Sequence, residues 1–253
     1  MVEVHDSEGT QSEPRPCACD GPSALLVELR EHVPFSVSAV AIGLIVAGAI
    51  CILGSSVGAL ETPAGGHDHA DHDHGPAFAL LFFHLFHPAH MLFSAAATTA
   101  MYVRYEGKPA KAIFVGLIGA IGVCGISDVV LPHLSLVILG AHTHWHICVV
   151  EHPGLVLPFA GVGVLVGLAT AGGVMRSTLI SHSLHVFAST MASIFYMVGP
   201  LGVIAWIDDL GKVLVFIIVA VMGPCCLSDI VFPMLMTSAG RAQFHEEVHV
   251  GCH

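Results

Sequence analysis

Charged side chains are scarce in this chain. Only 11% of its 253 residues are Asp, Glu, Lys or Arg, whereas 55% are hydrophobic, and the mean hydropathy is +0.81. Soluble domains carry roughly a quarter of charged residues, so the composition excludes an ordinary soluble domain and indicates an integral membrane protein with lipid around it. Among the charged residues, Lys and Arg are fewer than Asp and Glu, and the formal net charge is −11. We therefore expect no nucleic-acid partner.

Three further features are missing. The N-terminus has no basic segment followed by an apolar one, so we expect no signal peptide. The pattern GxxxxGK[ST] is absent, so nothing indicates a P-loop that hydrolyses nucleotide. Several of the eight cysteines lie in apolar segments, and the sequence therefore predicts no disulfide framework.

Six apolar stretches approach or exceed the roughly 20 residues that a helix needs to cross a bilayer. They are residues 35–53, 78–103, 112–134, 155–170, 184–206 and 213–237. The fourth is short unless it begins near residue 152. The sequence thus predicts an all-α polytopic membrane protein with six transmembrane helices.

Basic residues are distributed unevenly over the two sides that six spans define. Seven of the eight lie on the side of both termini, and Lys212 alone lies on the other. Because basic loops stay in the cytoplasm, both tails, 1–30 and 238–253, are expected there, with the spans in a prokaryotic inner membrane. The His-rich segments 65–76 and 135–150 would then lie outside. The oligomeric state stays open, and a homo-oligomer is possible.

Polar motifs recur with preserved spacing and in the same order. The pairs are Glu31-His32 and Glu151-His152; His87-x-x-His90-x-x-x-Ser94 and His182-x-x-His185-x-x-x-Ser189; and CGISDVVLP (124–132) and CCLSDIVFP (225–233). Shared polar residues at equal spacing indicate a duplication. Because each copy, 31–134 and 151–237, holds three helices, the two would cross the membrane in opposite senses. Inverted three-helix repeats are typical of secondary transporters.

The repeated residues are of types that bind transition metals. His87 and His90 share one face of a helix, as do Cys124 and Asp128. Imidazole and thiolate suit Zn, Ni, Co or Fe, whereas Mg and Ca take oxygen ligands. We predict a divalent transition metal as cofactor or cargo, held at an outer and an inner station. The predicted ligands are His87, His90, Cys124, Asp128, Glu151 and His152 for the outer station, and His182, His185, Cys225, Asp229, Glu31 and His32 for the inner one.

Other histidines lie in the predicted loops. We assign accessory metal capture to His67, His69, His72, His74, His142, His144 and His146. The tail segment 245–249 matches the HExxH pattern of zinc proteases, but no domain surrounds it to form a cleft, so it receives no catalytic role. His87-Pro88-x-His90 resembles the His/Pro/Asp box of small nickel permeases; its spacing differs and few residues match, so the resemblance assigns no family.

These features favour a secondary transporter, driven by a gradient or by coupled protons, for a metal ion such as Zn, Ni, Co, Mn or Fe, with the direction open. Three alternatives remain. A membrane-embedded non-haem metalloenzyme, such as an oxidase or desaturase, also carries histidine boxes, although usually denser ones. A metal sensor or chaperone would bind without transport. Intramembrane His and Ser can also serve only as hydrogen bonds between helices.

Overall fold

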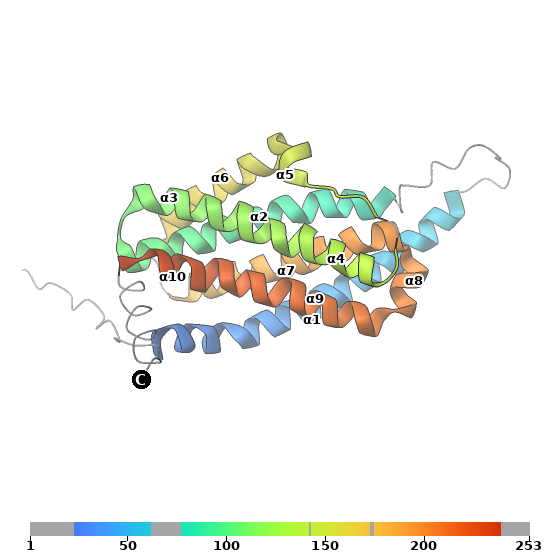
Figure 1. Ribbon diagram of the computed structural model, residues 1–253, viewed down its shortest axis with the longest axis horizontal. Helices are drawn as coiled ribbons and strands as arrows, with labels where there is room; N and C mark the ends of the chain where they lie inside the picture. Colours follow the sequence, from blue (N-terminus) through green and yellow to red (C-terminus); the bar gives the residue numbers. More distant parts are fainter. Residues whose placement is uncertain (1–22, 62–76, 142, 173–174, 239–253) are drawn as a thin grey trace, which may run out of the picture.

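The computed structural model describes residues 23–61, 77–141, 143–172 and 175–238, and within them every regular element is a helix. The elements are α1 (Ser23–Glu61), α2 (Ala77–Glu106), α3 (Pro109–Ile118), η1 (Gly119–Val123), η2 (Ile126–Val130), α4 (Leu131–Ile138), α5 (Cys148–Glu151), α6 (Pro153–Thr170), α7 (Met175–Leu201), α8 (Val203–Asp208), α9 (Leu210–Cys226), η3 (Leu227–Val231) and α10 (Phe232–Met236). The long helices run lengthwise through one elongated bundle (Figure 1).

Six helical segments of the described chain are long and apolar enough to cross a membrane. They are Arg30–Gly54, Phe78–Glu106, Pro109–Ile138, Pro153–Thr170, Ile180–Leu201 and Leu210–Met236. The prediction of an all-helical chain with six helices long and apolar enough to cross a membrane is thereby confirmed. The third span joins α3, η1, η2 and α4, and the sixth joins α9, η3 and α10.

Helices α2 and α7 lie side by side in the middle of the bundle (Figure 1). In α7, 72% of the most apolar window is buried, against 28% in α1 and in α6. The outside carries exposed apolar side chains such as Ile45, Leu165 and Val219. A large exposed apolar surface needs a cover, and here lipid provides it. The faces that α2 and α7 turn toward each other are therefore shielded from both lipid and water, whereas Leu81 of α2 and Ile180 of α7 are exposed.

Two glycines four residues apart let α6 approach α2 closely. A Cβ atom on Gly167 would lie 2.6 Å from the carbonyl oxygen of Ala96, and one on Gly163 would overlap the carbonyl oxygen of Leu92. Small residues at this spacing are a common means of helix association in lipid. The contact fixes α6 against the helix that carries the first histidine motif.

The π-helical turns η2 and η3 each contain the aspartate of a repeated motif. The N–H of Leu131 donates to the carbonyl of Ile126, five residues earlier. The next bond of this series would need an N–H at Pro132, and proline has none. Phe232 and Pro233 repeat the arrangement in η3. Each proline therefore leaves one carbonyl beside the aspartate without a helical donor.

The fifth span ends earlier than the sequence predicts. The apolar stretch extends to residue 206, but α7 stops at Leu201 and the chain turns at Gly202, whose φ is 76°. Glycine adopts this left-handed conformation without steric cost. The short helix α8 follows.

The two ends of the bundle can be told apart by their elements. Helix α1 begins and α10 ends at one end, which we call the α10 end, and α8 lies at the other, the α8 end (Figure 1). Helix α2 runs from the α8 end to the α10 end, and α7 runs in the opposite direction.

Candidate metal centre

Asp128, fully buried in η2, is the centre of the first polar set. Its Oδ2 accepts hydrogen bonds from Nδ1 of His87 at 2.8 Å and of His90 at 2.6 Å. Its Oδ1 accepts one from Oγ of Ser189, on α7, at 2.9 Å. A carboxylate removed from water requires such partners. The two histidines that the sequence places on one face of α2 thus converge on one acid.

Asp229, in η3, is the centre of a second set with the same design. Nδ1 of His182 donates to its Oδ2 at 2.9 Å, and Nδ1 of His185 at 2.5 Å. Oγ of Ser94, on α2, lies 3.5 Å from Oδ1. The serine of each histidine motif therefore faces the aspartate that serves the other motif.

The two sets touch each other in the middle of the bundle. The ring centroids of His90 and His185 are 4.4 Å apart. Sγ of Cys124 lies 3.9 Å from Nε2 of His185, and Sγ of Cys225 lies 3.8 Å from Nε2 of His90. The sequence predicts an outer and an inner station; the structure instead joins the two sets, because α2 and α7 are adjacent and present their motifs to each other.

Hydroxyl groups satisfy the carbonyls that the prolines leave free. Oγ of Ser193 donates to the carbonyl of Ser127 at 3.3 Å, and Oγ1 of Thr98 donates to the carbonyl of Ser228 at 3.1 Å. These carbonyls lie five residues before the two prolines. None of these four residues was predicted as part of the site, although Ser127 and Ser228 occupy equal places in the repeated CGISD and CCLSD segments.

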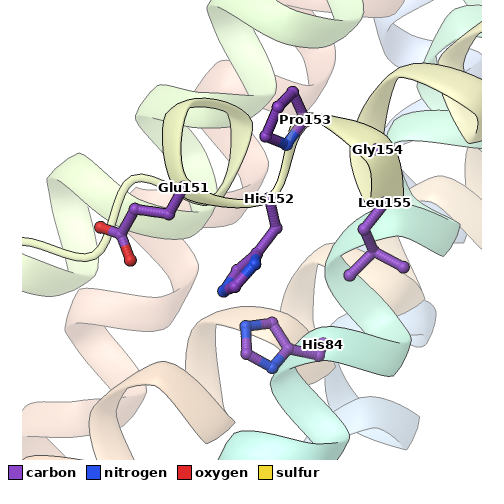
Figure 2. Close-up of a pocket in the computed structure, with 6 residues that line it drawn as sticks. All are labelled: His84, Glu151, His152, Pro153, Gly154 and Leu155. Atoms are coloured by element: carbon purple, nitrogen blue, oxygen red, sulfur yellow. The ribbon is translucent and has the colours of Figure 1, made fainter.

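A third polar group lies at the surface, between α2 and the start of α6. A pocket of about 390 Å³ is lined by His84, Glu151, His152, Pro153, Gly154 and Leu155. Figure 2 shows the imidazoles of His84 and His152 facing each other in it, with ring centroids 5.2 Å apart. Nε2 of His146 is 3.1 Å from Nε2 of His84, and its Nδ1 donates to Glu151 at 2.6 Å. We name His84, His146, Glu151 and His152 the surface set.

Two residues of the surface set, Glu151 and His152, lie beside a different histidine from the one that the sequence predicts. The sequence groups Glu151 and His152 with His87; the structure places them beside His84, one helical turn earlier on α2. His84 was not predicted as a site residue, although it extends the His87 and His90 spacing by one more step of three residues. The accessory residue His146 joins this set, while His144 is exposed.

Cys148 lies next to the surface set and was also not predicted. Its Sγ and the ring nitrogens of His84 and His146 lie within 4.8 Å of one another. Burial, followed by the negative charges of Glu151 and Asp128, raises the pKa of this thiol to about 11. At neutral pH it is therefore a neutral thiol.

At the α10 end, His32 is 2% exposed and its ring centroid lies 4.9 Å from that of His182. Oγ of Ser36 lies 2.9 Å from Nε2 of His182. The prediction that His32 adjoins the second set agrees with this geometry, whereas Glu31 is exposed. His67, His69, His72, His74 and His142, and the HExxH segment, fall outside the described residues.

Histidines thus form a series along the bundle. From the surface set to the α10 end they are His152, His84, His87, His90, His185, His182 and His32. Successive histidines of this series contact each other directly or through a shared aspartate, with one exception. Between His84 and His87 lies the ring of Phe83, whose centroid is 5.5 Å from that of His84 and 5.2 Å from that of His87.

Several groups in the described chain could hold a metal ion. Their ligand atoms lie within 4.8 Å of one another in the groups His84, His146 and Cys148; His90, Cys124 and His185; His146, Glu151 and His152; and His182, His185 and Asp229. The fold and these groups define a helical membrane protein with buried His, Asp and Cys clusters suited to metal. No protein-family model, curated protein or solved structure matches the chain.

Proposed function

We propose that the protein is a secondary transporter that moves a divalent transition-metal ion, such as Zn, Ni, Co, Mn or Fe, across the membrane. The observation that carries this proposal is the histidine series, which leads from an open surface pocket through the buried centre to His32. An ion that crosses a bilayer needs successive sites, each favourable enough to enter and weak enough to leave.

The distribution of the ligands supports passage more than catalysis at one centre. A single catalytic metal would use one group of ligands, whereas candidate ligands also lie away from the centre, at His84 and His32, and both of these adjoin further histidines. Imidazoles and carboxylates within a membrane also carry protons. Proton release from the histidines that contact Asp128 and Asp229 offers a means of coupling.

We also propose an inverted architecture for residues 31–134 and 151–237. Reciprocal contacts support it: Cys124 faces the second histidine motif as Cys225 faces the first. The excess of Lys and Arg on the side of the termini supports cytoplasmic termini. The α8 end, which carries Lys212, would then face outward, and the surface set would receive external ions.

Flux in liposomes tests the transporter. Purified full-length protein is reconstituted, and uptake of Zn, Ni, Co, Mn and Fe is measured against protein-free liposomes. Asp128→Asn and Asp229→Asn keep the side-chain shape and remove the charge, so we expect each to lower flux at least tenfold. Asp208→Asn is the matched control, because Asp208 is exposed at the end of α8, and it should transport normally.

The alternatives predict other results. If the protein moves no metal while a known transporter in parallel liposomes does, the transporter proposal is wrong. Bound iron with an oxygen-dependent optical spectrum would instead indicate a metalloenzyme. Tight metal binding without flux would indicate a sensor or chaperone.

A further inference from the structure

The structure assigns one four-ligand metal site to the centre of the bundle, made of His90, His185, Cys124 and Cys225. Each of the two sequence copies, 31–134 and 151–237, contributes one imidazole and one thiolate. The inference rests on the proposed function and deepens it, because this site would be the central station of the transported ion and would select among the candidate ions.

The orientation of the two imidazoles points to this site. Nδ1 of His90 donates to Asp128 and Nδ1 of His185 donates to Asp229. Histidines that bind metal usually donate their other nitrogen to a carboxylate in this way, which leaves Nε2 as the ligand atom. Both Nε2 atoms point at sulfur, at 3.8 Å from Cys225 and 3.9 Å from Cys124.

Two of the sulfur-to-nitrogen distances are close to those of a tetrahedral site. Bonds of about 2.3 Å to sulfur and about 2.0 Å to nitrogen give a sulfur-to-nitrogen separation of about 3.5 Å. The two observed separations, 3.8 and 3.9 Å, need a contraction of a few tenths of an ångström. His90, Cys124 and His185 already place their ligand atoms within 4.8 Å of one another. Cys225 is not part of that group, so its side chain must rotate toward Cys124 and His185 for the site to close on an ion.

The neighbouring histidines are less suited to the same ion. Nε2 of His182 is held by Ser36 at 2.9 Å, and the ring of His87 stacks on Phe83. Both also donate to an aspartate through Nδ1. They belong to the stations on either side of the centre.

The ligand set determines the class of ion. Two imidazoles and two thiolates suit Zn²⁺, and also Co²⁺ or Fe²⁺, and disfavour Mn²⁺ and Mg²⁺, which take oxygen ligands. The ion binds as both thiols release their protons, and two thiolates then neutralise its double charge inside the apolar bundle. Asp128 and Asp229 orient the imidazoles and are positioning residues rather than ligands.

Cobalt reports on this site directly. The full-length chain is prepared with Cys17, Cys19, Cys148 and Cys252 replaced by Ser, so that neither the two tails nor the thiol beside the surface set contributes a thiolate. Titration with Co²⁺ should produce intense visible bands of tetrahedral Co²⁺ and a near-ultraviolet thiolate-to-cobalt band, saturating at one ion per chain. X-ray absorption of the Zn²⁺-loaded form should show two sulfur and two nitrogen ligands, and this measurement needs no substitution in the bundle.

Variants in the same background separate ligands from positioning residues. Cys124→Ala and Cys225→Ala should each abolish the tetrahedral spectrum. Cys51→Ala, which removes an equally buried cysteine of α1, should preserve it. Asp128→Asn should keep the thiolate band and weaken binding about 10- to 100-fold, as loss of a carboxylate behind a ligating histidine does.

Each outcome of these measurements supports or refutes the metal site, the transporter or both. The site is refuted if Co²⁺ gives no thiolate band, if either Cys124→Ala or Cys225→Ala keeps it, or if zinc carries fewer than two sulfur ligands. A thiolate site without flux in liposomes refutes the transporter and leaves the site standing. Flux without the thiolate band refutes the site and leaves the transporter standing.

Discussion

His90 and His185 are 95 residues apart in the chain, yet their rings lie 4.4 Å from each other at the centre of the bundle. Each is held by an aspartate of the following span, and each faces the cysteine of the other sequence copy. The pair joins the two polar sets into one network, so we expect a substitution in one set to affect the other set.

The serine contacts of the two aspartates are unequal, which gives a first prediction. Ser189 bonds Asp128 at 2.9 Å, whereas Ser94 is 3.5 Å from Asp229, beyond the usual range for a hydroxyl donor. Because a hydrogen bond to a charged group contributes about 1.5–3 kcal/mol, Ser189→Ala should destabilise the protein more than Ser94→Ala. Thermal unfolding in detergent compares the two, and an equal or reversed order would contradict the geometry.

Helix packing gives a second prediction. Gly167→Leu places a side chain against the backbone of Ala96, and overpacking of this kind costs about 1–3 kcal/mol. Gly161→Leu is the control on the same helix, because a Cβ at Gly161 meets nothing within 4 Å. Unfolding temperature and the yield of folded protein measure the effect; equal behaviour of the two variants would argue against the α2 and α6 contact.

His84 supplies a third prediction. It lies at the surface pocket, outside the central network, so His84→Ala should weaken the capture of external ions and leave the central site intact. We expect the KM for transport to rise about tenfold with kcat little changed, since uniform binding is lost. His144→Ala, at an exposed position, is the control. A fall in kcat with KM unchanged would place His84 in the transport step itself.

Cys148 gives a fourth prediction, on pH. Its pKa is raised to about 11, so the reactive thiolate is rare at neutral pH and its population increases about tenfold per pH unit up to that value. Alkylation followed by site-resolved mass spectrometry should find Cys148 slower to react at pH 8 than free glutathione, with a rate that still rises above pH 10. A rate that levels off near pH 9 would show an ordinary thiol pKa.

The sequence alone was enough for the helical membrane class and for most residues of the central network. Low charge and apolar stretches of bilayer length predict the six spans, because lipid imposes both requirements. Motifs repeated at equal spacing single out His87, His90, Asp128 and their counterparts, since polar groups are costly in lipid and rarely recur by chance.

Only the tertiary structure decided how these residues combine. Spacing shows which side chains share a helix face, but the contact of α2 with α7 depends on packing between helices, including the glycines of α6. That contact joined the two predicted stations and set each cysteine against a histidine of the other sequence copy, while the packing of α6 on α2 placed Glu151 and His152 with His84. Periodicity describes one helix at a time, whereas a metal site requires atoms from several helices to meet at one point.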